Sequence, residues 1–167
     1  AARALRRMPD TDAAAALFDA IAKSRDEYVR YPAFVLFSAF GDARMPDVVR
    51  AALKDRNDRL REAAYAWLER HPDPSLADML LAAIDTEPGE FVRPAMLRAV
   101  SMLDANERVR VTLTREVERG LDIYRSAVIE ALGDRRAAYA VDAIAVAARQ
   151  DGPLQDDAVL ALGKIGG

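Results

Sequence analysis

No cysteine occurs anywhere in this 167-residue chain, and histidine occurs only once. Disulfides, zinc–thiolate sites and cysteine nucleophiles are therefore excluded. The single histidine, His71, lies in a proline-flanked turn and has no cysteine with which to form the usual zinc site. Glycine-rich phosphate loops and serine nucleophile elbows are also absent. We expect no metal, no cofactor and no enzymatic activity.

Long apolar runs are missing as well, because charges interrupt every stretch before the roughly 18 residues that a membrane span needs. The first residues are basic but no apolar run follows them, which is unlike a secretory signal. We therefore expect a cytoplasmic protein, although a removed signal would leave no trace. The net charge of -3 argues against non-specific nucleic-acid binding, which requires an excess of lysine and arginine, and leaves room only for a local basic face.

One short pattern recurs along the chain: an acidic residue, any residue, an apolar residue and an arginine. Its copies begin at Glu27, Asp58, Glu90 and Asp122 and end at Arg30, Arg61, Arg93 and Arg125, so the arginines lie 31, 32 and 32 residues apart. A fifth copy ends at Gln155, 30 residues later, and has lost both charges. A fixed period of this length predicts one supersecondary unit stacked on itself.

Each repeat holds two segments with the apolar spacing of amphipathic helices. We predict first helices over 27–40, 57–70, 89–103, 121–132 and 153–165, second helices over 11–23, 45–54, 74–85, 106–119 and 136–150, and a partial first helix over 1–8. The repeats then cover about 1–23, 27–54, 57–85, 89–119 and 121–150, with a partial repeat over 153–167. No segment alternates with period two, so the fold is expected to be all-α.

The last two copies have a distinctive sequence. An apolar-Arg pair and an alanine-rich helix lead into Ala-Leu-Gly in the segment 124–134, and Ala-Leu-Gly recurs in 158–166. These segments resemble the HEAT-like repeats first described in phycobilisome bilin lyases. In earlier copies Glu69 and Ser101 replace the motif glycine, and Gly41 is offset. The resemblance implies a right-handed α-solenoid of about five helical hairpins, forming a single domain over 1–167.

Both ends of the chain look truncated, because it starts inside a first helix and stops where a second helix should follow. Stacked repeats bury both faces, so uncapped ends would expose apolar surface. We expect either a segment of a longer repeat protein or a homodimer joined through an end.

The repeated arginines have two interpretations: an anion-binding ladder, or contacts that fix the register between repeats. We favour the second for Arg30, Arg61, Arg93 and Arg125. Asp55 precedes Arg61 by six residues and Asp85 precedes Arg93 by eight, so each arginine can reach an acid at the end of the preceding helix. An exposed pair of this kind contributes only about 0–1 kcal/mol, so its expected role is alignment rather than stability.

The resemblance places the second helices on the concave face, where a partner would bind. The repeat period aligns the exposed positions of these helices in three columns: Ala15, Asp47, Asp78, Val111 and Asp142; Asp19, Ala51, Ala82, Arg115 and Val146; Lys23, Lys54, Asp85, Glu118 and Arg149. The predicted partner-binding residues are Asp47, Asp78, Asp142, Arg115 and Arg149. A row formed by the three aspartates favours a basic peptide, but aspartate early in a helix also simply complements the helix dipole.

Two further clusters have competing interpretations. Arginines at 108, 110, 115 and 119 could bind an acidic partner, although the glutamates at 107, 116 and 118 favour a salt-bridged helix face. Phe34, Leu36, Phe37 and Phe40 have helical spacing and are expected in the core, whereas Tyr28 and Tyr31 could form an exposed contact pair.

These observations favour a non-catalytic scaffold that binds a protein or peptide segment on the concave face of the solenoid, with no nucleic acid and no membrane as partners. The aspartate row favours a basic segment. Two alternatives stay open: a bilin-lyase-like subunit, and a nucleic-acid-binding HEAT-like protein. The shared repeat is the only support for the first, and the acidic column and pI of about 5.3 speak against the second.

Overall fold

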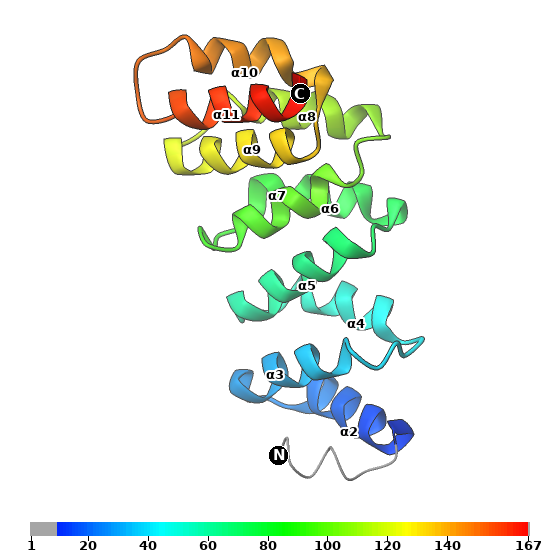
Figure 1. Cartoon of the computed structure of the whole chain (residues 1–167). Coiled ribbons are helices and arrows are strands. Elements are labelled where there is room, and N and C mark those ends of the chain that lie inside the picture. The colour runs from blue at the N-terminus through cyan, green and yellow to red at the C-terminus, as the bar shows by residue number, and fades with distance from the viewer. Residues whose placement is uncertain (1–9, 167) are drawn as a thin grey trace. The chain divides into compact units, whose positions relative to one another are not determined.

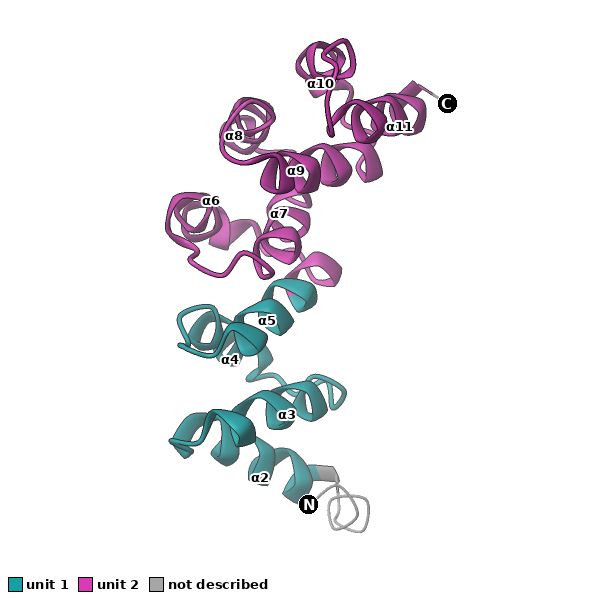
Figure 2. Cartoon of the chain, turned by 90° about the vertical axis from the view of Figure 1, so that its left-hand side faces the viewer, with its two compact units in different colours: residues 1–67 teal, residues 68–167 magenta. Residues whose placement is uncertain are grey.

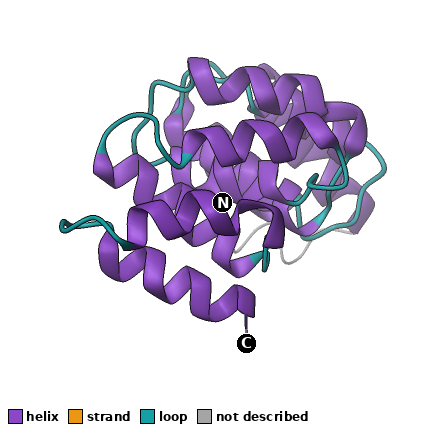
Figure 3. Cartoon of the chain, turned by 90° about the horizontal axis from the view of Figure 1, so that it is seen from above, coloured by secondary structure: helices purple, strands orange, loops and turns teal. Residues whose placement is uncertain are grey.

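The structure, a computed structural model, describes residues 10–166, and within them all regular structure is helical (Figures 1 and 3). The helices are α2 (Asp10–Lys23), α3 (Glu27–Phe37), α4 (Met45–Ala52), α5 (Asp58–Arg70), α6 (Ala77–Thr86), α7 (Arg93–Ser101), α8 (Glu107–Glu116), α9 (Asp122–Asp134), α10 (Val141–Ala148) and α11 (Gln155–Gly166). Short 3₁₀ turns, η1 (Pro74–Leu76) and η2 (Ala138–Ala140), precede α6 and α10. The all-α prediction is confirmed for these residues, while the predicted helix over 1–8 lies outside them.

Asparagine and aspartate side chains fix several helix starts. The carboxylate of Asp26 accepts from the backbone N–H of Tyr28 at 2.9 Å, and Asn106 accepts from that of Arg108 at 2.9 Å. Asn57 and Asp73 make the same contact at the starts of α5 and η1. These bonds satisfy backbone donors that no preceding turn can pair.

The chain divides into two compact units within α5 (Figure 2): unit 1 comprises residues up to Trp67, and unit 2 begins at Leu68. In unit 1, α2 packs against α3 and α4. Phe34 and Phe37 are fully buried there, as expected. Leu36 and Phe40 are 40% and 37% exposed, which corrects their assignment to the core. Leu36 lies on the far side of α3, because a helix presents only one stripe to its neighbours, and Phe40 lies in the turn after α3.

In unit 2 the first helices pack side by side, with α9 between α7 and α11. Polar contacts here join residues about one repeat apart: Arg98 with Glu69 at 3.2 Å, Ser126 with Asp157 at 2.6 Å, Arg135 with Asp104 at 3.0 Å, and Lys164 with Asp134 at 2.6 Å. Because the separations are 29–31 residues, each contact links equivalent regions of neighbouring helical hairpins. Sequence periodicity is therefore reproduced as contact periodicity inside this unit.

Gly133 shows why the Ala-Leu-Gly motif contains glycine. A Cβ added there would lie 2.9 Å from the Cα of Ala161, so α9 and α11 approach closely only because the side chain is absent. Gly163, at the equivalent position of the next repeat, has no described atom within 4 Å of such a Cβ. The glycine is thus needed where another first helix packs against it.

Between residues 10 and 166, no helix combines the length and the apolar character that crossing a bilayer requires.

Candidate functional site

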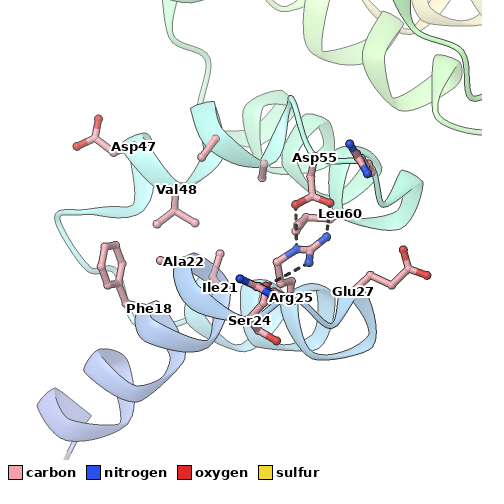
Figure 4. Close-up of a pocket in the computed structure, with 14 residues that line it drawn as sticks. Phe18, Ile21, Ala22, Ser24, Arg25, Glu27, Asp47, Val48, Asp55 and Leu60 are labelled. Atoms are coloured by element: carbon pink, nitrogen blue, oxygen red, sulfur yellow. Dashed lines mark hydrogen bonds and ion pairs between the residues drawn. The ribbon is translucent and has the colours of Figure 1, made fainter.

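A groove of about 760 Å³ lies between the second helices α2 and α4 of unit 1 (Figure 4). Its volume falls in the range of about 300–1,000 Å³ that is typical of ligand pockets. Apolar side chains line most of it: Phe18, Ile21 and Ala22 from α2, Val48 and Ala51 from α4, and Leu60 from α5. Because the positions where the two helices face each other include the small residues Ala22 and Ala51, space remains between them.

The wall at Phe18 is held from behind by an arginine. The guanidinium of Arg44 lies 4.4 Å from the centre of the Phe18 ring and 5.7 Å from that of Phe37. The same guanidinium forms an ion pair with Asp42 at 2.7 Å, and this bond, together with the Arg44 backbone N–H, lowers the pKa of Asp42 to about 2. A cation stacked on two rings and held by a carboxylate restricts the position of Phe18.

An ion pair closes the opposite end of the groove. Arg30 contacts the carboxylate of Asp55 through two N–H groups, with N···O distances of 2.9 and 2.7 Å, and also donates to the carbonyl of Ser24 at 3.2 Å. Burial by itself raises the pKa of Asp55, but hydrogen bonds from Arg30 and from the Asn57 backbone bring that pKa below its ordinary value. The carboxylate of Asp55 therefore already accepts hydrogen bonds from Arg30 and Asn57.

Two further arginines line this end of the groove. Arg25 and Arg56 are exposed, and their side chains make no hydrogen bond or ion pair with any residue in 10–166. Asp47 lies at the end near Phe18, where its exposed carboxylate is 3.5 Å from Arg50. The two ends of the groove consequently differ in charge.

The repeated arginines contact backbone carbonyls at the ends of the preceding second helices. Arg61 donates to the carbonyl of Asp55 at 2.8 Å, Arg93 to that of Glu87 at 3.2 Å, and Arg125 to that of Val117 at 2.8 Å. Arg30 does the same at Ser24. The last carbonyls of a helix have no intrahelical donor and carry partial negative charge, so an arginine there both satisfies and stabilises them.

The expected pairing of these arginines with acids needs correction in two places. The carboxylate of Asp55 binds Arg30, the arginine at the start of its own repeat, and Arg61 takes the carbonyl of Asp55 instead. Asp85 lies 3.5 Å from Arg119 rather than beside Arg93. The loop between the two helices turns its carbonyls, and not the acidic side chains, toward the incoming arginine.

Gln155, at the fifth copy of the pattern, keeps this contact without a charge. Its amide nitrogen donates to the carbonyl of Ala148, the last residue of α10, at 3.3 Å. The hydrogen bond to the preceding helix is therefore the conserved element of the five copies within this chain, and the positive charge is not.

Every position of the three aligned columns is exposed. We call these positions the second-helix face and describe them within each unit separately. In unit 2, Asp78 forms an ion pair with Arg108 at 2.6 Å, which links α6 to α8. Asp142 and Arg149 on α10 have no side-chain partner among the described residues. Of the three aspartates in the predicted row, Asp78 is thus neutralised by an arginine of the neighbouring helix.

Arg115 belongs to a cluster that the sequence did not reveal. Glu116 is only 3% exposed and accepts from Arg115 at 2.8 Å, from Arg119 at 2.9 Å and from the hydroxyl of Tyr124 at 3.2 Å. Burial, followed by the charge of Glu116, raises the pKa of Tyr124. The interleaved charges of α8 do form a salt-bridged helix, as favoured above. The sequence did contain one indication that Glu116 is buried: it shares the apolar side of α8 with Val109 and Leu113.

No group of three or more histidine and acidic side chains in 10–166 is arranged to hold a metal ion. His71, the single histidine, is exposed in the turn before η1.

Compared with known proteins, the chain matches no protein-family model and no curated protein sequence.

Proposed function

We propose that this chain is a HEAT-like α-solenoid that acts as a non-catalytic scaffold and binds a segment of a partner protein along its second helices. The observation that carries the proposal is the groove between α2 and α4, an apolar channel with charged side chains at both ends, of which Arg25 and Arg56 have no side-chain partner in residues 10–166. An apolar centre with a polar, solvent-accessible rim is the anatomy of a protein-interaction site.

Repetition supports the architectural part of the proposal. The arginine-to-carbonyl contact recurs at each copy of the pattern, and contacts one repeat apart recur inside unit 2. Repeats that meet their neighbours through the same contacts each time form a stack, and stacks of repeats present long surfaces to partners.

Selection of peptides by the intact chain tests this function. Short random peptides displayed on phage would be selected against the immobilised protein, synthesised with a fluorescent label, and titrated by anisotropy. We expect saturable binding that unlabelled peptide displaces. If selection enriches no sequence that binds the folded chain above the level of its scrambled counterpart, the scaffold function is wrong.

NMR mapping locates the surface involved. Amide resonances of α2 and α4 should shift on titration with a selected peptide, because these helices form the groove walls. Shifts confined to residues outside the second helices would contradict the proposed location.

A further inference from the structure

We propose that the groove between α2 and α4 takes a partner segment that combines an apolar anchor with a carboxylate, and that this carboxylate contacts Arg25 and Arg56. This inference rests on the proposed function, since it specifies the partner of the same groove.

Arg25 and Arg56 occupy equivalent places on the two sides of the groove. Each follows a second helix by two or four residues, and they lie 31 residues apart, one repeat length. Both line the groove, both are exposed, and neither side chain has a partner in residues 10–166. The groove therefore carries one such arginine on the α2 side and one on the α4 side. Guanidinium groups are well suited to a partner carboxylate because they bind carboxylates through two parallel hydrogen bonds.

Of the two acids that line the groove at this end, Asp55 is already paired and Glu27 is exposed. Asp55 is held by both donors of Arg30 and by the Asn57 backbone N–H. Glu27 extends outward, away from Phe18 and Val48, in Figure 4. Two arginines without a side-chain partner in residues 10–166 thus outnumber the one exposed acid here, so this end attracts a carboxylate and repels a basic side chain.

The apolar part of the groove lies toward the other end. Val48 of α4 faces Ile21 and Ala22 of α2, and Phe18 closes the channel beside Asp47 (Figure 4). An aliphatic or aromatic side chain inserted here removes apolar surface from water. The order of the two features gives the bound segment a direction: the anchor sits near Phe18 and the acid near Arg25 and Arg56.

Charge complementarity also decides against a basic partner at this groove. Asp47, the acid that lines the anchor end, forms an ion pair with Arg50 at 3.5 Å and is exposed to solvent, which screens its charge. At the opposite end, the two arginines Arg25 and Arg56 outnumber the exposed acid Glu27.

The test compares peptides selected by the intact protein with those selected by its R25E/R56E variant. We expect the first set to combine apolar residues with Asp or Glu, and to bind the variant about tenfold more weakly or worse. Replacing the acid of a selected peptide by Lys should restore binding to the variant. Arg59→Glu is the matched control, because Arg59 is exposed in the same unit but does not line the groove, and it should change affinity by less than about twofold.

The outcomes separate the two proposals. Peptides that bind the chain but lack acids, prefer Lys or Arg, or tolerate R25E/R56E overturn the carboxylate inference and leave the scaffold function standing. Absence of any specific peptide binding to the folded chain overturns the scaffold function itself, and the inference with it. Circular dichroism of each variant confirms that its fold is intact before affinities are compared.

Discussion

The guanidinium of Arg30 and the carboxylate of Asp55 meet across 25 residues through two hydrogen bonds, of 2.9 and 2.7 Å. The pair connects the first turn of α3 to the loop after α4, and the same carboxylate accepts from the backbone N–H of Asn57 at the start of α5. One side chain thereby links three helices of unit 1. The side chains of Arg30 and Asp55 are 16% and 18% exposed, so solvent screens the contact only partly.

Asp55→Asn should lower the free energy of unfolding near neutral pH by about 1–3 kcal/mol, the range for hydrogen bonds to charged groups. The folded-state pKa of Asp55 lies below its ordinary value, so the stabilisation is present above the unfolded pKa of about 3.9 and is lost as the pH falls through the folded value. The difference between wild type and variant should therefore shrink in acid. Urea denaturation at neutral and acidic pH measures it.

Asp151→Asn provides the control, since Asp151 is exposed in a turn and has no side-chain partner among the described residues. A D55N variant no less stable than D151N near neutral pH would show that the ion pair contributes nothing to folding.

Gly133→Ala should destabilise the fold by about 1–3 kcal/mol, because the new Cβ meets the backbone of Ala161 at 2.9 Å and the helices must move apart. Gly163→Ala, at the equivalent motif position, has open space around it and should instead stabilise by up to about 1 kcal/mol through helix propensity. Thermal unfolding of both variants gives the comparison. Equal effects of the two substitutions would contradict the close approach of α9 and α11.

Gln155→Arg restores the arginine of the repeated pattern and should stabilise by about 0.3–1 kcal/mol, since it places a positive charge at the carboxyl end of α10. The gain should decrease as salt is added. Chemical denaturation at low and high ionic strength would detect it. A destabilised variant would show that position 155 does not correspond to the other four.

The Arg108–Asp78 pair between α6 and α8 should contribute little. Its side chains are 69% and 81% exposed, so hydration and salt screen the attraction. A double-mutant cycle with R108A and D78A should give a coupling energy below about 1 kcal/mol. A larger coupling would mean that the second helices of unit 2 depend on this bridge for their packing.

Periodicity was sufficient to predict the helices and the exposed second-helix face within residues 10–166. The repeat length places the second-helix positions in columns, and every column member is exposed, because equivalent residues of a repeated helix face the same way. Cap residues such as Asp26 and Asn106 define the helix starts for local reasons that a sequence displays directly.

Partner choice within the loops could not be predicted in the same way. Spacing shows that Arg61 can reach residue 55, but not whether the carbonyl or the carboxylate of Asp55 points toward it. The burial of Glu116 depends on Arg119, in the turn after α8, and on Tyr124, in α9. The groove between α2 and α4 likewise depends on how far apart two helices lie, which a list of apolar positions does not contain.

Partner binding in the groove between α2 and α4 is tested most directly by one pair of substitutions at the same repeat position. Ala51→Gln places a longer side chain in the groove, and Ala82→Gln makes the identical change on the exposed face of α6. Both should fold normally, because glutamine is a good helix former. Measured by fluorescence anisotropy with a peptide selected on the wild-type chain, A51Q should weaken binding about tenfold while A82Q leaves it unchanged. Equal affinities for A51Q, A82Q and wild type would contradict binding in this groove.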